Sequence, residues 1–205
     1  MNRTLLATLA VIVGVVVLIA LLLGGGYNRM VGLDEQVKEA WSQVENVYQR
    51  RADLIPNLVA TVKGAANFEQ QTLQNVVEAR AKVGQVRFEG TPTAEQLRMF
   101  QANQDALSSA LSRLLVVSEQ YPQLRATENF RDLQAQLEGS ENRIAVERRR
   151  FNEVSREYNA ARRSFPMVLF AGMLGFAEKP YFESAPGAEN APKVDFGGGS
   201  GSNTP

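Results

Sequence analysis

A three–four spacing of mostly apolar residues from Phe130 to Phe165, interrupted only by Ser140 and Glu147, is the feature that most restricts how this chain can fold. Residues at these steps lie along one face of an α-helix, and an apolar face of that length has to be buried against other helices. The pattern ends at Pro166, which cannot continue a helix. The sequence therefore predicts one long helix that packs against other helices.

Three earlier stretches carry the same three–four spacing: Val37 to Val62, Leu73 to Val83, and Leu97 to Leu114. Thr93 and Gln96 precede the third stretch with the spacing of a capping box, which marks the start of a helix. No part of this region alternates with a period of two, so no strand is predicted. We expect an all-α fold, a long antiparallel four-helix bundle with up-down-up-down topology.

The N-terminal region has no charged side chain between Thr4 and Asn28, and Leu5 to Leu23 is almost wholly aliphatic. As a helix, Leu5 to Leu23 would be about 28 Å long, close to the hydrocarbon thickness of a bilayer. A cleaved signal peptide is the alternative, but its apolar core is usually about 7–15 residues long and an Ala-x-Ala site follows it. We expect one uncleaved transmembrane helix, and the charges on its two sides leave its orientation open.

Three glycines, Gly24 to Gly26, follow this apolar run. Because each glycine costs a helix about 1 kcal/mol, they predict a hinge between anchor and domain. The alternative is a frayed continuation of the helix. The expected division is an anchor with its hinge at residues 1–26, a helical domain at 27–183 and a flexible tail rich in Pro, Gly, Asn and Ser at 184–205.

Composition excludes several classes of function. Lys plus Arg number 22 and Asp plus Glu also number 22, so no general positive charge favours nucleic acid. The sequence has neither Cys nor His, which excludes Ser-His-Asp triads, HExxH zinc sites and the His-containing di-iron sites of bundles. We expect no enzyme, no cofactor, no metal site and no small-molecule substrate.

Arg51, Arg80 and Glu147 occupy positions that the spacing assigns to the bundle core. A buried guanidinium needs a carboxylate partner or has to reach water at the edge of the bundle. We predict a polar layer in which Arg51 faces Glu147 or Glu141, and in which such a pair fixes helix register rather than performs catalysis. The alternative is that each side chain extends to the bundle edge.

A short apolar segment after the last stripe, with its neighbours, forms a collar at residues 165–182. In an up-down-up-down bundle this segment returns to the level at which the first helix leaves the membrane. We predict that the collar contacts the bilayer surface or the anchor; the alternative is a lid over the end of the core. The residues expected near the membrane are Tyr27, Arg162, Arg163, Phe165, Leu169, Phe170, Leu174 and Phe176.

Several longer motifs resemble the LemA family of bacterial membrane proteins over roughly residues 5 to 183. They include Tyr27-Asn28-x-Met30-Val31, the run from Arg50 to Val59, Glu119-x-Tyr121-Pro122, and Glu141-Asn142-Arg143-Ile144-Ala145. The resemblance implies one N-terminal transmembrane helix and a helical domain at the bacterial cytoplasmic membrane. It supplies no reaction and no catalytic residues.

These features together predict a membrane-anchored, non-catalytic interaction or scaffold protein of the bacterial cell envelope. Its expected partners are the lipid bilayer and either another protein or a second copy of itself. Two alternatives stay open: an enzyme that uses carboxylates and arginine on envelope material, and a homo-oligomeric membrane organiser.

Overall fold

The computed structural model describes residues 3–64, 68–85, 88 and 90–183, without the side chains of residues 3–7, 10 and 15–23. Within these residues every regular element is helical, so the all-α prediction is confirmed. The elements are α1 (Arg3–Lys63), α2 (Gln70–Gly84), α3 (Ala94–Ser118), α4 (Pro122–Arg125), α5 (Glu128–Arg163) and the 3₁₀ helix η1 (Met167–Leu169).

The long helix α1 contains 61 residues and is continuous through Gly24, Gly25 and Gly26. The structure therefore has the continued helix and not the break in secondary structure that we associated with a hinge. Helical residues on both sides favour continuation, because adding a residue to an existing helix is easier than starting a new one. Gly26 also has a packing role, since a Cβ atom there would lie 2.9 Å from Cε of Met167.

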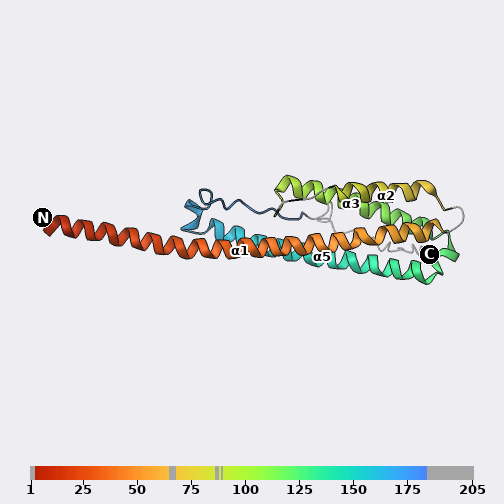
Figure 1. Ribbon diagram of the computed structural model, residues 1–205, viewed down its shortest axis with the longest axis horizontal. Coiled ribbons are helices and arrows are strands. Elements are labelled where there is room, and N and C mark those ends of the chain that lie inside the picture. The colour runs from red at the N-terminus through yellow and green to blue at the C-terminus, as the bar shows by residue number, and fades with distance from the viewer. Residues whose placement is uncertain (1–2, 65–67, 86–87, 89, 184–205) are drawn as a thin grey trace, which may run out of the picture.

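Helices α1 and α5 run antiparallel along most of the molecule, and α2 and α3 form a shorter antiparallel pair beside them (Figure 1). Successive long helices point in opposite directions, as expected. A bundle of four helices along the whole length is not confirmed, because α2 has 15 residues and α3 has 25, against 36 in α5. After η1 the chain turns and extends back along the α1–α5 pair (Figure 1).

Two clusters of buried apolar side chains form the core. The distal cluster lies at the end of α1 that α2 covers, and all four longer helices contribute to it; its members include Ile55, Leu58, Val76, Leu111, Phe130 and Leu137. The proximal cluster lies against the middle of α1, nearer its N-terminus than the distal cluster, and there the C-terminal residues take the place of α2. Its members include Trp41, Phe100, Ile144, Phe151, Phe176 and Phe182.

The predicted capping box at the start of α3 is confirmed. The Gln96 amide nitrogen donates to Thr93 Oγ1 at 3.3 Å, and the Thr93 amide nitrogen donates to Gln96 Oε1 at 2.8 Å. These two bonds satisfy backbone donors that an uncapped helix leaves unpaired. They begin α3 at the level of the proximal cluster, so that Leu97 and Phe100 enter that cluster.

The predicted anchor, Leu5 to Leu23, is helical in its backbone, but most of its side chains lie outside the described residues. Within the part of the chain that the structure describes, none of the helices combines the length and the apolar character needed to cross a bilayer. The predicted tail, residues 184–205, lies outside the described residues as well.

Phe130 and Phe165 belong to the same stripe, yet 1% of Phe130 and 81% of Phe165 is exposed. We expect Phe130→Ala to lower the free energy of unfolding by about 3–5 kcal/mol, because the lost ring leaves a cavity in the distal cluster. The matched change Phe165→Ala should stay within about 0.5 kcal/mol of the parent. Denaturant unfolding followed by circular dichroism measures both, and equal losses would contradict the burial pattern.

Candidate functional site

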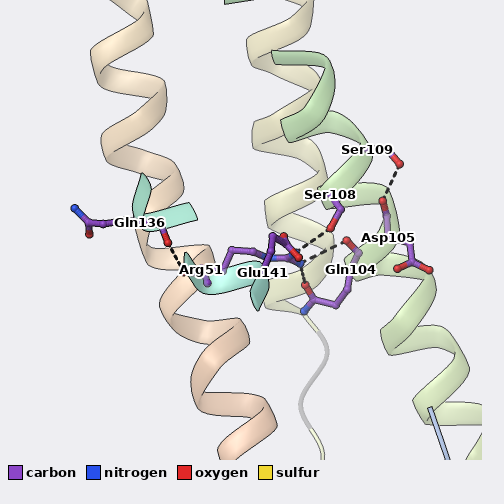
Figure 2. Close-up of polar contacts among 8 residues, drawn as sticks. Arg51, Gln104, Asp105, Ser108, Ser109, Gln136 and Glu141 are labelled. Carbon is purple, nitrogen blue, oxygen red and sulfur yellow. Dashed lines mark hydrogen bonds and ion pairs between the residues drawn. The ribbon is translucent and has the colours of Figure 1, made fainter. Parts of the chain in front are cut away.

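Arg51 lies in the middle of the helical domain, and only 1% of this charged residue is exposed to solvent. Its Nη1 donates to Ser108 Oγ at 2.9 Å and forms an ion pair with Glu141, and its Nη2 donates to the side chain of Gln104. Figure 2 shows the guanidinium reaching Gln104 and Ser108, with Glu141 beside it. One side chain of α1 thus binds both α3 and α5.

This polar layer lies between the two apolar clusters. Arg51 in α1, Gln104 in α3, and Ser140 with Glu141 in α5 each fall where their helix passes from the proximal to the distal cluster. Arg51 Nε and Gln104 Nε2 are enclosed with no hydrogen-bond partner among the described residues. Because a half-satisfied polar layer contributes little net stability, its physical effect is to specify which residues face each other.

The structure places Glu141, and not Glu147, against Arg51. Glu147 lies six residues further along α5, about 9 Å away along the helix axis, so it belongs to the level of the proximal cluster. Arg80 is half-buried and donates through Nε to the carbonyl oxygen of Ala52 at 3.0 Å. The sequence pattern did not single out Gln104, although it fills the step between Phe100 and Leu107 and is the one polar break in that stripe.

A second polar arrangement holds the extended C-terminal segment, residues 176–183, on α5. Asn159 donates through Nδ2 to the Lys179 carbonyl at 2.8 Å and accepts from the Lys179 amide at 2.9 Å. Asn152 makes the same pair of bonds with Phe182, at 3.0 and 2.8 Å. Seven helical residues and three extended residues both span about 10 Å, so the two asparagines match the repeat of an extended backbone.

The side chain of Phe182 fills the part of the proximal cluster that α2 does not reach. Its ring centroid lies 6.2 Å from that of Trp41 and 5.6 Å from that of Phe151, and the Arg148 guanidinium lies 4.6 Å above it. Aromatic contacts at these distances add to the stabilisation from area burial. The C-terminal segment is therefore part of the core.

Lys179 joins the C-terminal segment to α1, because its Nζ lies 2.6 Å from Oδ1 of Asp34 and 5.1 Å from the centroid of the Tyr158 ring. Burial alone would raise the pKa of Asp34, but Lys179 and Lys38 hold that pKa below its usual value of 3.8. Burial, with the Asp34 charge nearby, raises the pKa of Tyr158 to about 12. The pair with Asp34 therefore stabilises the fold at neutral pH, and its contribution is lost only on acidification through the lowered pKa of Asp34.

The residues predicted to lie near the membrane divide into two groups. Tyr27, Phe165, Leu169 and Leu174 are exposed, as is Arg163, and Phe170 is half-buried. Phe176, also expected near the bilayer or the anchor, is buried, with its ring centroid 5.5 Å from that of Tyr27. Arg162 is half-buried and donates through Nε to the Phe176 carbonyl at 2.8 Å, which fixes the turn after η1.

An open cleft of about 840 Å³ lies at the opposite end of the rod, where α1 ends and α5 begins. Gly64, Tyr121, Pro122 and Asn129 are among the residues that line it. The described lining offers amides and hydroxyls but no carboxylate, ammonium or guanidinium group. The cleft is of a size that accepts a peptide side chain or a small molecule.

These features define an elongated helical protein whose core is divided by an arginine-centred polar layer and completed by an extended C-terminal segment. Residues 40–196 match the LemA family, and the chain belongs to that family.

Three curated proteins are similar to this chain. Magnetosome protein MamQ 2 of Paramagnetospirillum magneticum is 26% identical over 182 residues, which cover 80% of this chain and 66% of that protein. Magnetosome protein MamQ of Magnetospirillum gryphiswaldense is 24% identical with the same coverage. Protein LemA of Metamycoplasma hominis is 22% identical over 136 residues, 66% of this chain and 59% of that protein. The chain thus spans less than two thirds of the length of each of these relatives.

A double-mutant cycle tests whether Arg51 and Glu141 interact energetically. We expect Arg51→Met and Glu141→Gln to be coupled by about 1–2 kcal/mol, since the guanidinium is buried while 48% of the Glu141 side chain is exposed. The surface pair Arg125 and Glu119, replaced in the same way, should show about 0.2–1 kcal/mol. Denaturant unfolding gives both values, and a coupling no larger than that of the surface pair would contradict a role for the layer in register.

Hydrogen exchange tests whether the asparagines hold the C-terminal segment. We expect Asn159→Ala to raise the exchange rates of the amides in residues 177–183 by about tenfold or more, because two backbone hydrogen bonds are lost. The exposed Asn142 of α5 offers the matched control, and Asn142→Ala should leave those rates unchanged. Unchanged exchange in both variants would mean that side-chain packing alone holds the segment.

Proposed function

We propose that this chain is a non-catalytic, membrane-anchored rod of the bacterial cell envelope, which presents a helical surface to a protein partner or to a second copy of itself. The proposal extends the family assignment, which by itself names no activity. The bilayer and the partner are both parts of the proposal.

The observation that carries the proposal is the continuity of α1. The uncharged stretch from Thr4 to Asn28 and the core-forming stretch from Met30 to Val62 belong to one unbroken helix. A helix satisfies its own backbone hydrogen bonds in hydrocarbon, so the first part can lie in a bilayer while the second part packs against α5. An anchor continuous with the rod transmits direction, which a flexible linker does not.

The charged groups of the core support a structural role. Both Nη atoms of Arg51 make contacts between helices, and Nε of Arg80 donates a hydrogen bond to the backbone carbonyl of Ala52. General acid–base catalysis needs titratable groups that converge on a concave site. The described lining of the distal cleft offers hydrogen-bonding groups instead, which suit recognition.

The proposed rod would hold its distal end at a fixed distance from the bilayer and raise the effective concentration of its partners. From Gly24 to Lys63, α1 is about 60 Å long, so the distal cleft would stand that far from the bilayer. Confinement to a membrane raises the effective concentration of partners in the same membrane, and modest contacts then suffice.

Charges placed in the apolar run test the anchor. We expect the full chain to remain in the membrane pellet after an alkaline carbonate wash, and Val16→Arg with Leu18→Arg to release it. Each arginine at the centre of a membrane helix disfavours insertion by about 2.5–3.5 kcal/mol. The measurement is the fraction of chain in pellet and supernatant.

Val116 offers the control, because it is exposed on α3 at the distal half of the rod. Val116→Arg should leave the chain in the pellet. If the parent chain itself is extracted by carbonate, the anchor and the proposed function are wrong. The mass of the detergent-solubilised chain then separates self-association from binding to a different protein.

A further inference from the structure

The turn that follows α5 exposes an unusual amount of apolar surface. Within ten residues, five large apolar side chains face solvent, and we call them the apolar rim: Phe165, Val168, Leu169, Met173 and Leu174. Met173 is the most exposed of them, at 86%. Single apolar residues are normal on a protein surface, but five within ten residues is a concentration that suggests an interaction site.

The apolar rim is held at a defined level of α1. Gly26 lies against the side chain of Met167, and Tyr27 packs on Phe176. A shallow cleft of about 330 Å³ joins Gly24 and Tyr27 of α1 to Met173 and Leu174 of the rim. The rim therefore lies beside residues 24–28, immediately after the uncharged run.

The buried residues of the same turn explain why the rim points outward. Met167, Ala171 and Phe176 enter the proximal cluster; four rim residues lie between them in sequence, and Phe165 lies two residues before Met167. The Phe176 amide closes the turn by donating to the Ala171 carbonyl at 2.9 Å. The turn is thus amphipathic, with one side committed to the core and the other left open.

We propose that the apolar rim is inserted into the interface of the bilayer that α1 enters, as a second lipid contact of the protein. This inference rests on the proposed membrane anchor. Tyr27 lies four residues beyond Leu23, about 6 Å along the helix, and interfacial segments reach about 5–10 Å into the boundary between headgroups and acyl chains. The rim is therefore at the correct height.

Charge favours lipid over a protein surface as the occupant. Arg29 and Arg163 are exposed; Arg29 directly follows residues 24–28 of α1, and Arg163 ends α5 two residues before Phe165. Basic side chains next to an apolar insertion attract anionic lipid headgroups. The rim with these two arginines has the composition of an interfacial anchor.

The sequence contains no cysteine, so a single introduced thiol can be labelled without altering any other position. The experiment uses the full chain in vesicles of phosphatidylcholine and phosphatidylglycerol, with Met173→Cys carrying an environment-sensitive fluorophore. Val116→Cys is the matched control on the distal half, because Val116 is also exposed. Nitroxide-labelled lipids then report direct contact with acyl chains.

We expect the label at residue 173 to shift to shorter emission wavelength and to be quenched by lipid nitroxides, and the label at residue 116 to show neither effect. Emission typical of water at residue 173 would overturn the proposal. A blue shift without lipid quenching would overturn it as well, because the rim would then face protein. Flotation of the same vesicles reports the anchor separately, so failure of the rim and failure of the proposed function are distinguishable.

Discussion

The packing of α5 against α1 is the interaction on which the rest of the structure depends. Both helices carry apolar stripes longer than α2 and α3 can cover, so the pair would leave part of its core open to water. The extended segment at residues 176–183 closes that opening with Phe176 and Phe182. An extended chain has backbone groups that no helix satisfies, and Asn152 and Asn159 supply the missing partners.

The polar layer determines the register of the helices, which the repeating apolar stripes alone leave open. Two stripes with a seven-residue repeat could pack in several registers displaced by about 10 Å, with similar burial in each. Arg51 finds Glu141, Gln104 and Ser108 in only one of these registers. A register that separated Arg51 from Glu141, Gln104 and Ser108 would break the contacts that a buried guanidinium makes here, which is far more unfavourable than the loss of a few apolar contacts. The layer thus contributes uniqueness more than stability.

Helices, stripes and the Thr93 cap could be predicted because they depend on residues close in sequence. The sequence predicted Glu141 or Glu147 as the acid partner of Arg51. The choice of Glu141 depends on how far α1 is displaced along α5, which is a property of the tertiary packing. The three glycines predicted a hinge from helix propensity, and α1 instead continues through them. The C-terminal segment has no periodicity, and Asn152 and Asn159 look like ordinary surface amides until the segment lies on them. Such contacts join residues far apart in sequence and leave no local signal.

The C-terminal residues also connect the core to the proposed lipid contact. Contacts of Met167 with Gly26, of Phe176 with Tyr27 and of Lys179 with Asp34 tie the C-terminal residues to two levels of α1, residues 26–27 and residue 34. A single membrane helix leaves the body attached to it free to tilt about one point. An apolar rim fixed beside that helix provides a second point of attachment, and tilting away from the rim would then expose apolar surface to water. If both contacts form, the direction of the rod relative to the membrane follows from the packing of α1, α5 and the C-terminal segment alone.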